Sequence, residues 1–288
     1  MMRPFGSARS GWAGTQWTGP GAGSGPGLTE RIVMLVGAGY YRHVPGWDFL
    51  VAPQWRSVRP FALTAPDQFR TDPPPTLDSA AYAADFAEVA ATGRDVSAVR
   101  TADESEYAAF WYEFSDIGWN RVTRVAAREH ELDLWDSARL FALVNVGMAD
   151  AYIGGWDSKI HWDFWRPVTA IAAADDDGNE GTIAIPDWVP YLPTPPIQDH
   201  PSTHSALGAA AATVLEGILG DKGFAMTSTT ALEVAPWRSY ESFSSAALEN
   251  AESRIHAGIH FRSATVAGFE LGRSIGNHVL NTFTTVTD

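Results

Sequence analysis

Three short clusters of cationic and imidazole side chains are the parts of this sequence best suited to chemistry. The first places two cations, Lys159 and Arg166, seven residues apart in a stretch rich in tryptophan and phenylalanine. In a continuous helix this spacing puts both side chains on one face. Burying unpaired charge is very costly, so these cations either bind an anion, pair with Asp150 and Asp157, or reach solvent. The first cluster alone leaves these alternatives open.

The second cluster, His200-Pro-Ser-Thr-His204, directly precedes an alanine-rich helical run. Pro201 and Ser202 are favoured at helix starts. The amides of Ser202, Thr203 and His204 would then lie at the positive end of the helix dipole, where anions bind. His204 could give or take a proton there. The alternative is an ordinary capped helix with surface histidines.

The third cluster centres on Gly258. Residues six apart in a continuous helix point roughly 120° away from each other. Gly258 predicts a left-handed helix end, so Arg254 and His260 could turn toward one centre. His256 and Arg262 would then be structural or face solvent. A helix C-terminus that merely carries positive side chains is the alternative.

Considered together, the clusters favour a site for a tetrahedral or trigonal oxyanion. They combine three cations, one helix N-terminus and two histidines. Each charge-assisted hydrogen bond contributes about 1.5–3 kcal/mol, so five or six could hold a dianion tightly.

The hydrophobic pattern predicts an all-α fold, a helical bundle with the oxyanion site at its centre, because no run alternates with a two-residue period. Residues 116–118 are expected to break the chain between two helices, and Pro167 to end the long one near Arg166. The expected helices are one capped by Asp78, then 104–114, 120–130, 134 to about 165, 202–219, about 244–257 and about 263–281.

Composition bounds the domain organisation. Residues 1–28 are rich in Gly, Ser and Pro and are expected to be disordered. Residues 29–288 are expected to form a single α-helical domain, because a chain this long can bury a large core.

Charge and composition exclude several classes of partner. The formal net charge of −14 argues against nucleic acid. No cysteine is present, which excludes thiol chemistry. No apolar run is long enough to span a membrane, and no signal-peptide core is visible. The expected location is the cytoplasm as written, or secretion if the true N-terminus is missing. The sequence does not indicate an oligomeric state.

The three motifs, Lys-x6-Arg-Pro, Pro-Ser-x-His and Ser-Arg-x5-His, resemble the ordered signature shared by vanadium-dependent haloperoxidases and type-2 phosphatidic acid phosphatases. The surroundings are more similar to the bacterial haloperoxidases. The stretches that carry this second similarity are 55–61, 166–171 and 257–261, and the resemblance covers about residues 40 to 281.

The resemblance implies a vanadate cofactor, with phosphate or sulfate as alternative occupants. It implies that His260 binds the vanadium and that His204 is the acid–base group. The residues expected to hold the vanadate oxygens are Lys159, Arg166, Ser202, Thr203 through its amide, and Arg254. The implied reaction oxidises a halide with hydrogen peroxide and halogenates a small organic acceptor.

Two other functions remain open. An acid phosphatase would use the same atoms, with His260 forming a phosphohistidine and His204 protonating the leaving group. A non-catalytic protein would bind an oxyanion without turnover.

Four departures from the family pattern matter. Thr203 stands where glycine is usual. Ala264 occupies a position where the family often has aspartate, so an orienting carboxylate is expected to be missing, which favours a haloperoxidase over a phosphatase. Ile197 stands where haloperoxidases tend to carry an aromatic residue near the halide, so the resemblance does not fix which halide is used. Before about residue 40 a Gly-rich stretch replaces the family's further helical chain, consistent with a truncated or misplaced start.

Overall fold

The computed structural model describes residues 35–227 and 237–284. Eight α-helices lie in these ranges, which confirms the predicted all-α class. They are α1 (Ala80–Thr92), α2 (Ala102–Phe110), α3 (Ser115–Glu129), α4 (Leu134–Trp162), α5 (Pro167–Ala172), α6 (Thr203–Leu219), α7 (Phe243–His256) and α8 (Arg262–Thr284). The disorder expected for 1–28 lies outside the described residues, and the domain expected from residue 29 stays a prediction.

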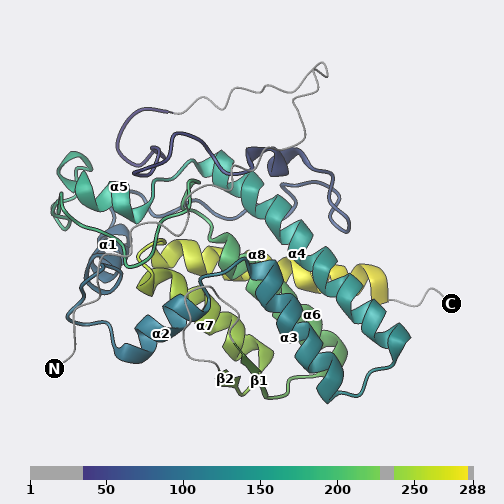
Figure 1. Ribbon diagram of the computed structural model, residues 1–288. Coiled ribbons are helices and arrows are strands. Elements are labelled where there is room, and N and C mark those ends of the chain that lie inside the picture. Colours follow the sequence, from purple (N-terminus) through teal and green to yellow (C-terminus); the bar gives the residue numbers. More distant parts are fainter. Residues whose placement is uncertain (1–34, 228–236, 285–288) are drawn as a thin grey trace, which may run out of the picture. The chain divides into compact units, whose positions relative to one another are not determined.

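Helix α6 is surrounded by other helices of the bundle. It packs against α4, α7 and α8, and α3 lies beside α4 and α6 (Figure 1). Its alanine-rich sequence allows this, because small side chains let neighbouring backbones approach closely. Almost every side chain in its first three turns is buried. The start of α6 therefore lies inside the bundle, where an anion site at its N-terminus would be shielded from water.

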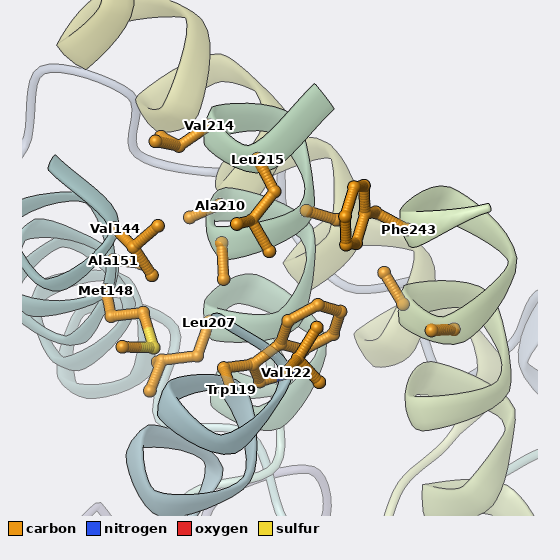
Figure 2. Packing of buried hydrophobic residues seen from close by; sticks show 14 of the residues in the cluster. Trp119, Val122, Val144, Met148, Ala151, Leu207, Ala210, Val214, Leu215 and Phe243 are labelled. Atoms are coloured by element: carbon orange, nitrogen blue, oxygen red, sulfur yellow. The ribbon is translucent and has the colours of Figure 1, made fainter. Parts of the chain in front are cut away.

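The main hydrophobic core forms around the same helix. Figure 2 shows Leu207, Ala210 and Leu215 of α6 between Met148 of α4 and Phe243 of α7. All of these side chains are at most 2% exposed. Burying a leucine, methionine or phenylalanine side chain contributes roughly 1.5–3 kcal/mol relative to leaving it in water.

A short β-ribbon joins α6 to α7 and was not expected from the sequence. Strands β1 (Phe224–Thr227) and β2 (Trp237–Tyr240) pair antiparallel, with Phe224 opposite Tyr240. The ring of Phe224 also stacks on Phe243, with 5.0 Å between centroids. Four-residue strands are too short for their alternation to stand out in a sequence.

Two predicted helix starts were wrong by a few residues. Helix α1 is capped by Ser79, whose side chain accepts from the Tyr82 amide, and not by Asp78. Residues 116–118 do not break the chain but form the first turn of α3. Gly118 is tolerated there because it faces the Glu113 side chain, which a Cβ at this position would meet at 2.7 Å.

The end of α4 differs from the prediction in a way that matters for the site. The helix stops at Trp162, where Asp163 adopts left-handed geometry with φ 49° and ψ 37°. Arg166 therefore lies beyond the helix. The expectation that Lys159 and Arg166 share one helix face was wrong. Pro167 begins α5 instead of merely ending α4, since its fixed φ suits a first helical position.

Other local predictions were confirmed. Ser202 caps α6, and Gly220 follows its last residue. Gly258 has φ +79°, and a Cβ there would lie 2.1 Å from the Gly93 carbonyl oxygen. Only glycine fits at this point. In the described part of the chain, no helix is long and apolar enough to cross a membrane.

Candidate oxyanion site

Lys159 lies on the last turn of α4 with its side chain fully buried. Its Nζ donates to the carbonyl oxygens of Gln198 at 2.6 Å and Asp199 at 3.0 Å. An ammonium has three N–H groups, so one remains for a ligand. Burial, with the nearby charge of Arg166, holds the pKa of Lys159 well below its ordinary value.

Arg166 joins the loop before the second cluster to the third cluster. Its Nε donates to the Ile197 carbonyl at 2.6 Å, and its Nη1 donates to the Ile259 carbonyl at 2.6 Å. The same Nη1 lies 2.9 Å from Nε2 of His260. These contacts span sequence separations of 31 to 94 residues, so Arg166 fixes both flanking loops around itself.

Arg254, on the last turn of α7, is 1% exposed. Its Nε donates to Ser253 Oγ at 2.9 Å, and its guanidinium lies 5.9 Å from the Tyr112 ring centroid. It forms no ion pair with any carboxylate in residues 35–227 and 237–284. Burial lowers its pKa to about 10. A buried cation without a carboxylate partner calls for an anionic ligand.

His260 presents a lone pair on Nε2. An arginine N–H can only donate, so the contact with Arg166 makes Nε2 the acceptor and leaves the proton on Nδ1. That Nδ1 lies 2.9 Å from Oδ1 of Asp199, although the two are not aligned as a hydrogen bond. Burial lowers the pKa of His260 well below its usual range, so the ring is neutral.

Asp199 corrects the expectation drawn from Ala264. A carboxylate does face His260, but it comes from the loop before α6 and not from α8. Asp199 is fully buried, also lies 3.8 Å from Arg166, and has its pKa raised to about 7, chiefly by burial. Ala264 instead uses its carbonyl oxygen to accept the Ser202 N–H at 2.8 Å. The sequence signal was the position of Asp199 beside the His200–His204 motif.

His204 is held in the opposite tautomer. Its Nε2 lies 2.7 Å from the Glu113 carbonyl oxygen. A carbonyl only accepts, so Nε2 carries the proton and Nδ1 has the lone pair. Burial and the charge of Arg254 lower the pKa of His204 to about 3. Unlike His260, this side chain keeps some solvent exposure.

The start of α6 supplies fewer free amides than expected. The Ser202 amide is engaged with Ala264, whereas the amides of Thr203 and His204 are the first of the helix and have no partner within it. The Thr203 methyl group lies against Gly155 of α4, where a Cβ would approach it to 2.8 Å. Gly155 thus makes room for threonine at the usual glycine position.

The alternative pairings for the first cluster are not present. The carboxylate of Asp150 accepts the backbone amides of residues 61–63, and Asp157 binds Arg70 at 2.7 Å. His256 and Arg262 lie outside the site. His256 packs against Tyr107, and Arg262 bridges two glutamates.

The resulting pocket fits an oxyanion such as vanadate or phosphate. Lys159, Arg166 and Arg254 are buried with Asp199 as the one carboxylate that the described contacts bring to them. N–H groups remain for anionic oxygens, and His260 Nε2 provides one lone pair for a metal. No group of three His, Cys, Asp or Glu suited to a metal cation occurs in the described residues.

Comparison with known families agrees with this chemistry. The model of the "VCPO second helical-bundle domain" matches residues 139–288, just over half of the chain and all three clusters. The chain belongs to the vanadium haloperoxidase superfamily.

Individual members of this superfamily are similar over different extents. Vanadium chloroperoxidase of Curvularia inaequalis is 35% identical over 91 residues, covering 28% of this chain and 14% of the relative. A crystal structure described as that of the first bacterial vanadium-dependent iodoperoxidase is 32% identical with a TM-score of 0.76, over 87% of this chain and 62% of that one.

An apo bacterial vanadium-dependent chloroperoxidase shares the fold, with 19% identity and a TM-score of 0.65 over 85% of this chain and 60% of that one. The chain thus spans less than two thirds of the length of these superfamily members.

Proposed function

We propose that this chain is a vanadium-dependent haloperoxidase that oxidises a halide with hydrogen peroxide. The observation that carries the proposal is the group of buried cations around a neutral imidazole lone pair, formed by Lys159, Arg166 and Arg254 with His260. The activities for which the relatives are named, chloroperoxidase and iodoperoxidase, support the same proposal.

The chain's own residues divide the work of binding. The free N–H groups of the three cations, the Ser202 hydroxyl and the Thr203 amide would hold the oxygens of vanadate, and His260 Nε2 would bind the metal. The Arg166 contact to Nε2 must open for that bond to form. When bound, vanadate supplies a Lewis-acidic centre that activates peroxide.

His204 would manage protons at the edge of the site. Its Nε2–H is fixed to the Glu113 carbonyl, so Nδ1 is the nitrogen that can take a proton from peroxide and return it later. Its low pKa keeps it unprotonated at neutral pH, and the bound anion would raise that pKa by opposing the Arg254 charge.

A phosphatase is the second candidate, and one observation favours it. Asp199 lies 2.9 Å from His260 Nδ1, which is where a carboxylate orients a histidine nucleophile. Asp199 thus supplies the carboxylate that Ala264 lacks, so Ala264 no longer disfavours a phosphatase.

One pair of assays separates the two functions. Vanadate-loaded protein given peroxide and bromide is expected to brominate a phenol-type dye, while phosphate monoesters hydrolyse slowly. His260→Ala should abolish bromination, and His204→Ala should retain vanadate but lose most turnover. Fast, vanadate-inhibited phosphatase activity without bromination would reverse the assignment. Oxyanion binding with neither activity would support the non-catalytic alternative.

The oxyanion site itself is tested by removing one buried cation. Arg254→Ala should weaken vanadate binding by roughly 2–4 kcal/mol, because charge-assisted hydrogen bonds are lost. The matched control is Arg262→Ala, which removes an arginine paired with Glu88 and Glu252 outside the site. Equilibrium vanadate titration measures both. Equal affinities for wild type and Arg254→Ala would exclude Arg254 from the site.

A further inference from the structure

An aromatic cavity of about 380 Å³ opens between α3, α4 and the loop that precedes α1. Its walls include Trp55, Phe114, Tyr152 and Trp156. Tyr152 stands between the two tryptophans, with ring centroids 5.6 Å from Trp55 and 5.0 Å from Trp156. This volume lies within the usual range for small-molecule sites, which are mostly apolar with a few polar groups.

Apart from its aromatic residues, the cavity is lined by two residues with polar side chains, the carboxylate Asp116 and the amide Asn145. The Asn145 side chain is already engaged, since it exchanges hydrogen bonds of 2.9 Å with Asn120. The Asp116 carboxylate makes no hydrogen bond or ion pair with any described residue. It lies near Tyr152, where burial together with this charge raises the Tyr152 pKa to about 12. The cavity thus offers aromatic ring faces and one negatively charged hydrogen-bond acceptor, the Asp116 carboxylate, which no described residue occupies.

Three connections, two along the chain and one through hydrogen bonds, link this cavity to the oxyanion site. Phe114 follows Glu113, whose carbonyl holds His204. Trp156 follows Gly155, which faces the Thr203 methyl group. These two pairs give the cavity and the oxyanion site adjoining walls on α3 and on α4.

The loop before α1 makes the third connection. Trp156 Nε1 donates to the Val51 carbonyl at 3.1 Å, and the Val51 amide donates to Pro196, beside the Ile197 carbonyl that binds Arg166. On each of these sides, a residue that lines the cavity is a neighbour in sequence, or through one hydrogen bond, of a residue that contacts the oxyanion site.

We propose that this cavity binds the organic acceptor, and that the acceptor is a small aromatic molecule with a hydroxyl or N–H donor and no negative charge, such as a phenol or an indole. The rings of Trp55, Tyr152 and Trp156 stack with the aromatic part, and Asp116 accepts the donor hydrogen. The same carboxylate repels aromatic acids. This inference rests on the proposed function, since an acceptor site has meaning only beside a halide-oxidising centre.

Binding is tested without the cofactor. The affinities of 4-fluorophenol and 4-fluorobenzoate for vanadate-free protein are measured by ¹⁹F NMR. Ala149 of α4 lines the cavity, and Ala149→Phe should weaken 4-fluorophenol binding by about tenfold or more, the effect of altering an apolar pocket. The matched control is Ala138→Phe, an exposed position on the same helix, which should keep wild-type affinity. Asp116→Asn should narrow the preference for fluorophenol over fluorobenzoate without filling the cavity.

Activity gives a second readout. In Ala149→Phe the KM for a phenol acceptor should rise several-fold more than the KM for iodide measured without any acceptor. Equal fluorophenol affinity in wild type and Ala149→Phe, or equal binding of fluorobenzoate and fluorophenol to wild type, would overturn the acceptor site. Absence of iodide and bromide oxidation in the wild type would instead overturn the proposed function.

Discussion

His260 and His204 are neutral imidazoles held in opposite tautomers, and this difference assigns them different work. Arg166 donates to Nε2 of His260, which keeps that nitrogen as a lone pair. His204 donates from Nε2 to the Glu113 carbonyl, which leaves the lone pair on Nδ1. Both pKa values are lowered by burial. One ring can therefore bind a metal or attack an electrophile while the other moves a proton.

Asp199→Asn tests how the carboxylate acts on His260. Two effects compete. Removing a buried negative charge strengthens binding of every anion, whereas replacing the carboxylate beside Nδ1 by a neutral amide lowers the basicity of His260 and weakens the Nε2–metal bond. Partners of metal-bound histidines typically change metal affinity by roughly 10- to 100-fold. Phosphate cannot gain from the metal bond, so the preference for vanadate over phosphate should fall by about this factor. Competitive titration of the two anions measures it.

The control for this variant is Asp177→Asn. Asp177 is also a buried carboxylate, but it binds Thr182 and the Asn179 amide away from the site. It should leave the ratio of vanadate to phosphate affinity as in the wild type. An unchanged ratio in Asp199→Asn would mean that Asp199 only balances charge and does not orient His260.

The sequence predicted which residues form the site better than it predicted which groups those residues contact. Local motifs marked Lys159, Arg166, Arg254 and both histidines, because each motif lies within ten residues. The contacts that set their chemistry are distant, such as His204 with Glu113, 91 residues earlier. Only the folded chain brings such pairs together, so neither the Glu113 carbonyl nor the role of Asp199 could be read from spacing.

At the scale of elements, the close approach of α8 to α6 positions the anion-binding turn. A Cβ at Gly268 would lie 2.2 Å from the Ser202 carbonyl oxygen, and one at Gly272 would lie 2.1 Å from that of Ala206. The four-residue spacing puts both glycines on one face of α8. Backbone packed against backbone leaves Ser202 little freedom, which fixes the start of α6.

Gly272→Ala is therefore expected to destabilise the protein, although alanine is the better helix former by about 1 kcal/mol. The added methyl group meets rigid backbone, and overpacking of this kind costs roughly 1–3 kcal/mol. Gly217→Ala is the matched control, since its methyl group would meet the flexible end of Leu280 and should cost less. Chemical denaturation measures both. A Gly272→Ala protein more stable than Gly217→Ala would contradict this account of the packing.

Helix interiors were predictable from the sequence, whereas several helix ends were not. The apolar spacing along 134–162 and 203–219 was long enough to stand out. The end of α4 depended on Asp163 adopting left-handed geometry, which few non-glycine residues do. The start of α3 depended on Gly118 fitting beside Glu113. The ends of these helices depend on single local contacts, and such contacts leave no periodic pattern in the sequence.

At the scale of the whole molecule, the charge of the site opposes the charge of the chain. The chain carries a formal charge of −14. Lys159, Arg166 and Arg254 are nevertheless buried together, and among residues 35–227 and 237–284 Asp199 is the one carboxylate found beside them. The net negative charge of the chain therefore repels an anion at long range, whereas the buried cations attract it at short range. Salt screens the long-range field of exposed charges far more than the field of buried ones.

Added salt should consequently speed the binding of vanadate, the reverse of what a positively charged entrance would give. Between about 10 and 150 mM ionic strength the screening length falls from roughly 30 to 8 Å. The association rate should then rise by a factor on the order of three to ten, as surface repulsion is screened. The dissociation rate should change little, because buried contacts hold the anion. Stopped-flow tryptophan fluorescence with sodium acetate as the salt measures both rates, and an uncharged osmolyte is the control. An association rate that falls with salt would show that the entrance itself is positive and that the chain's net charge does not govern access.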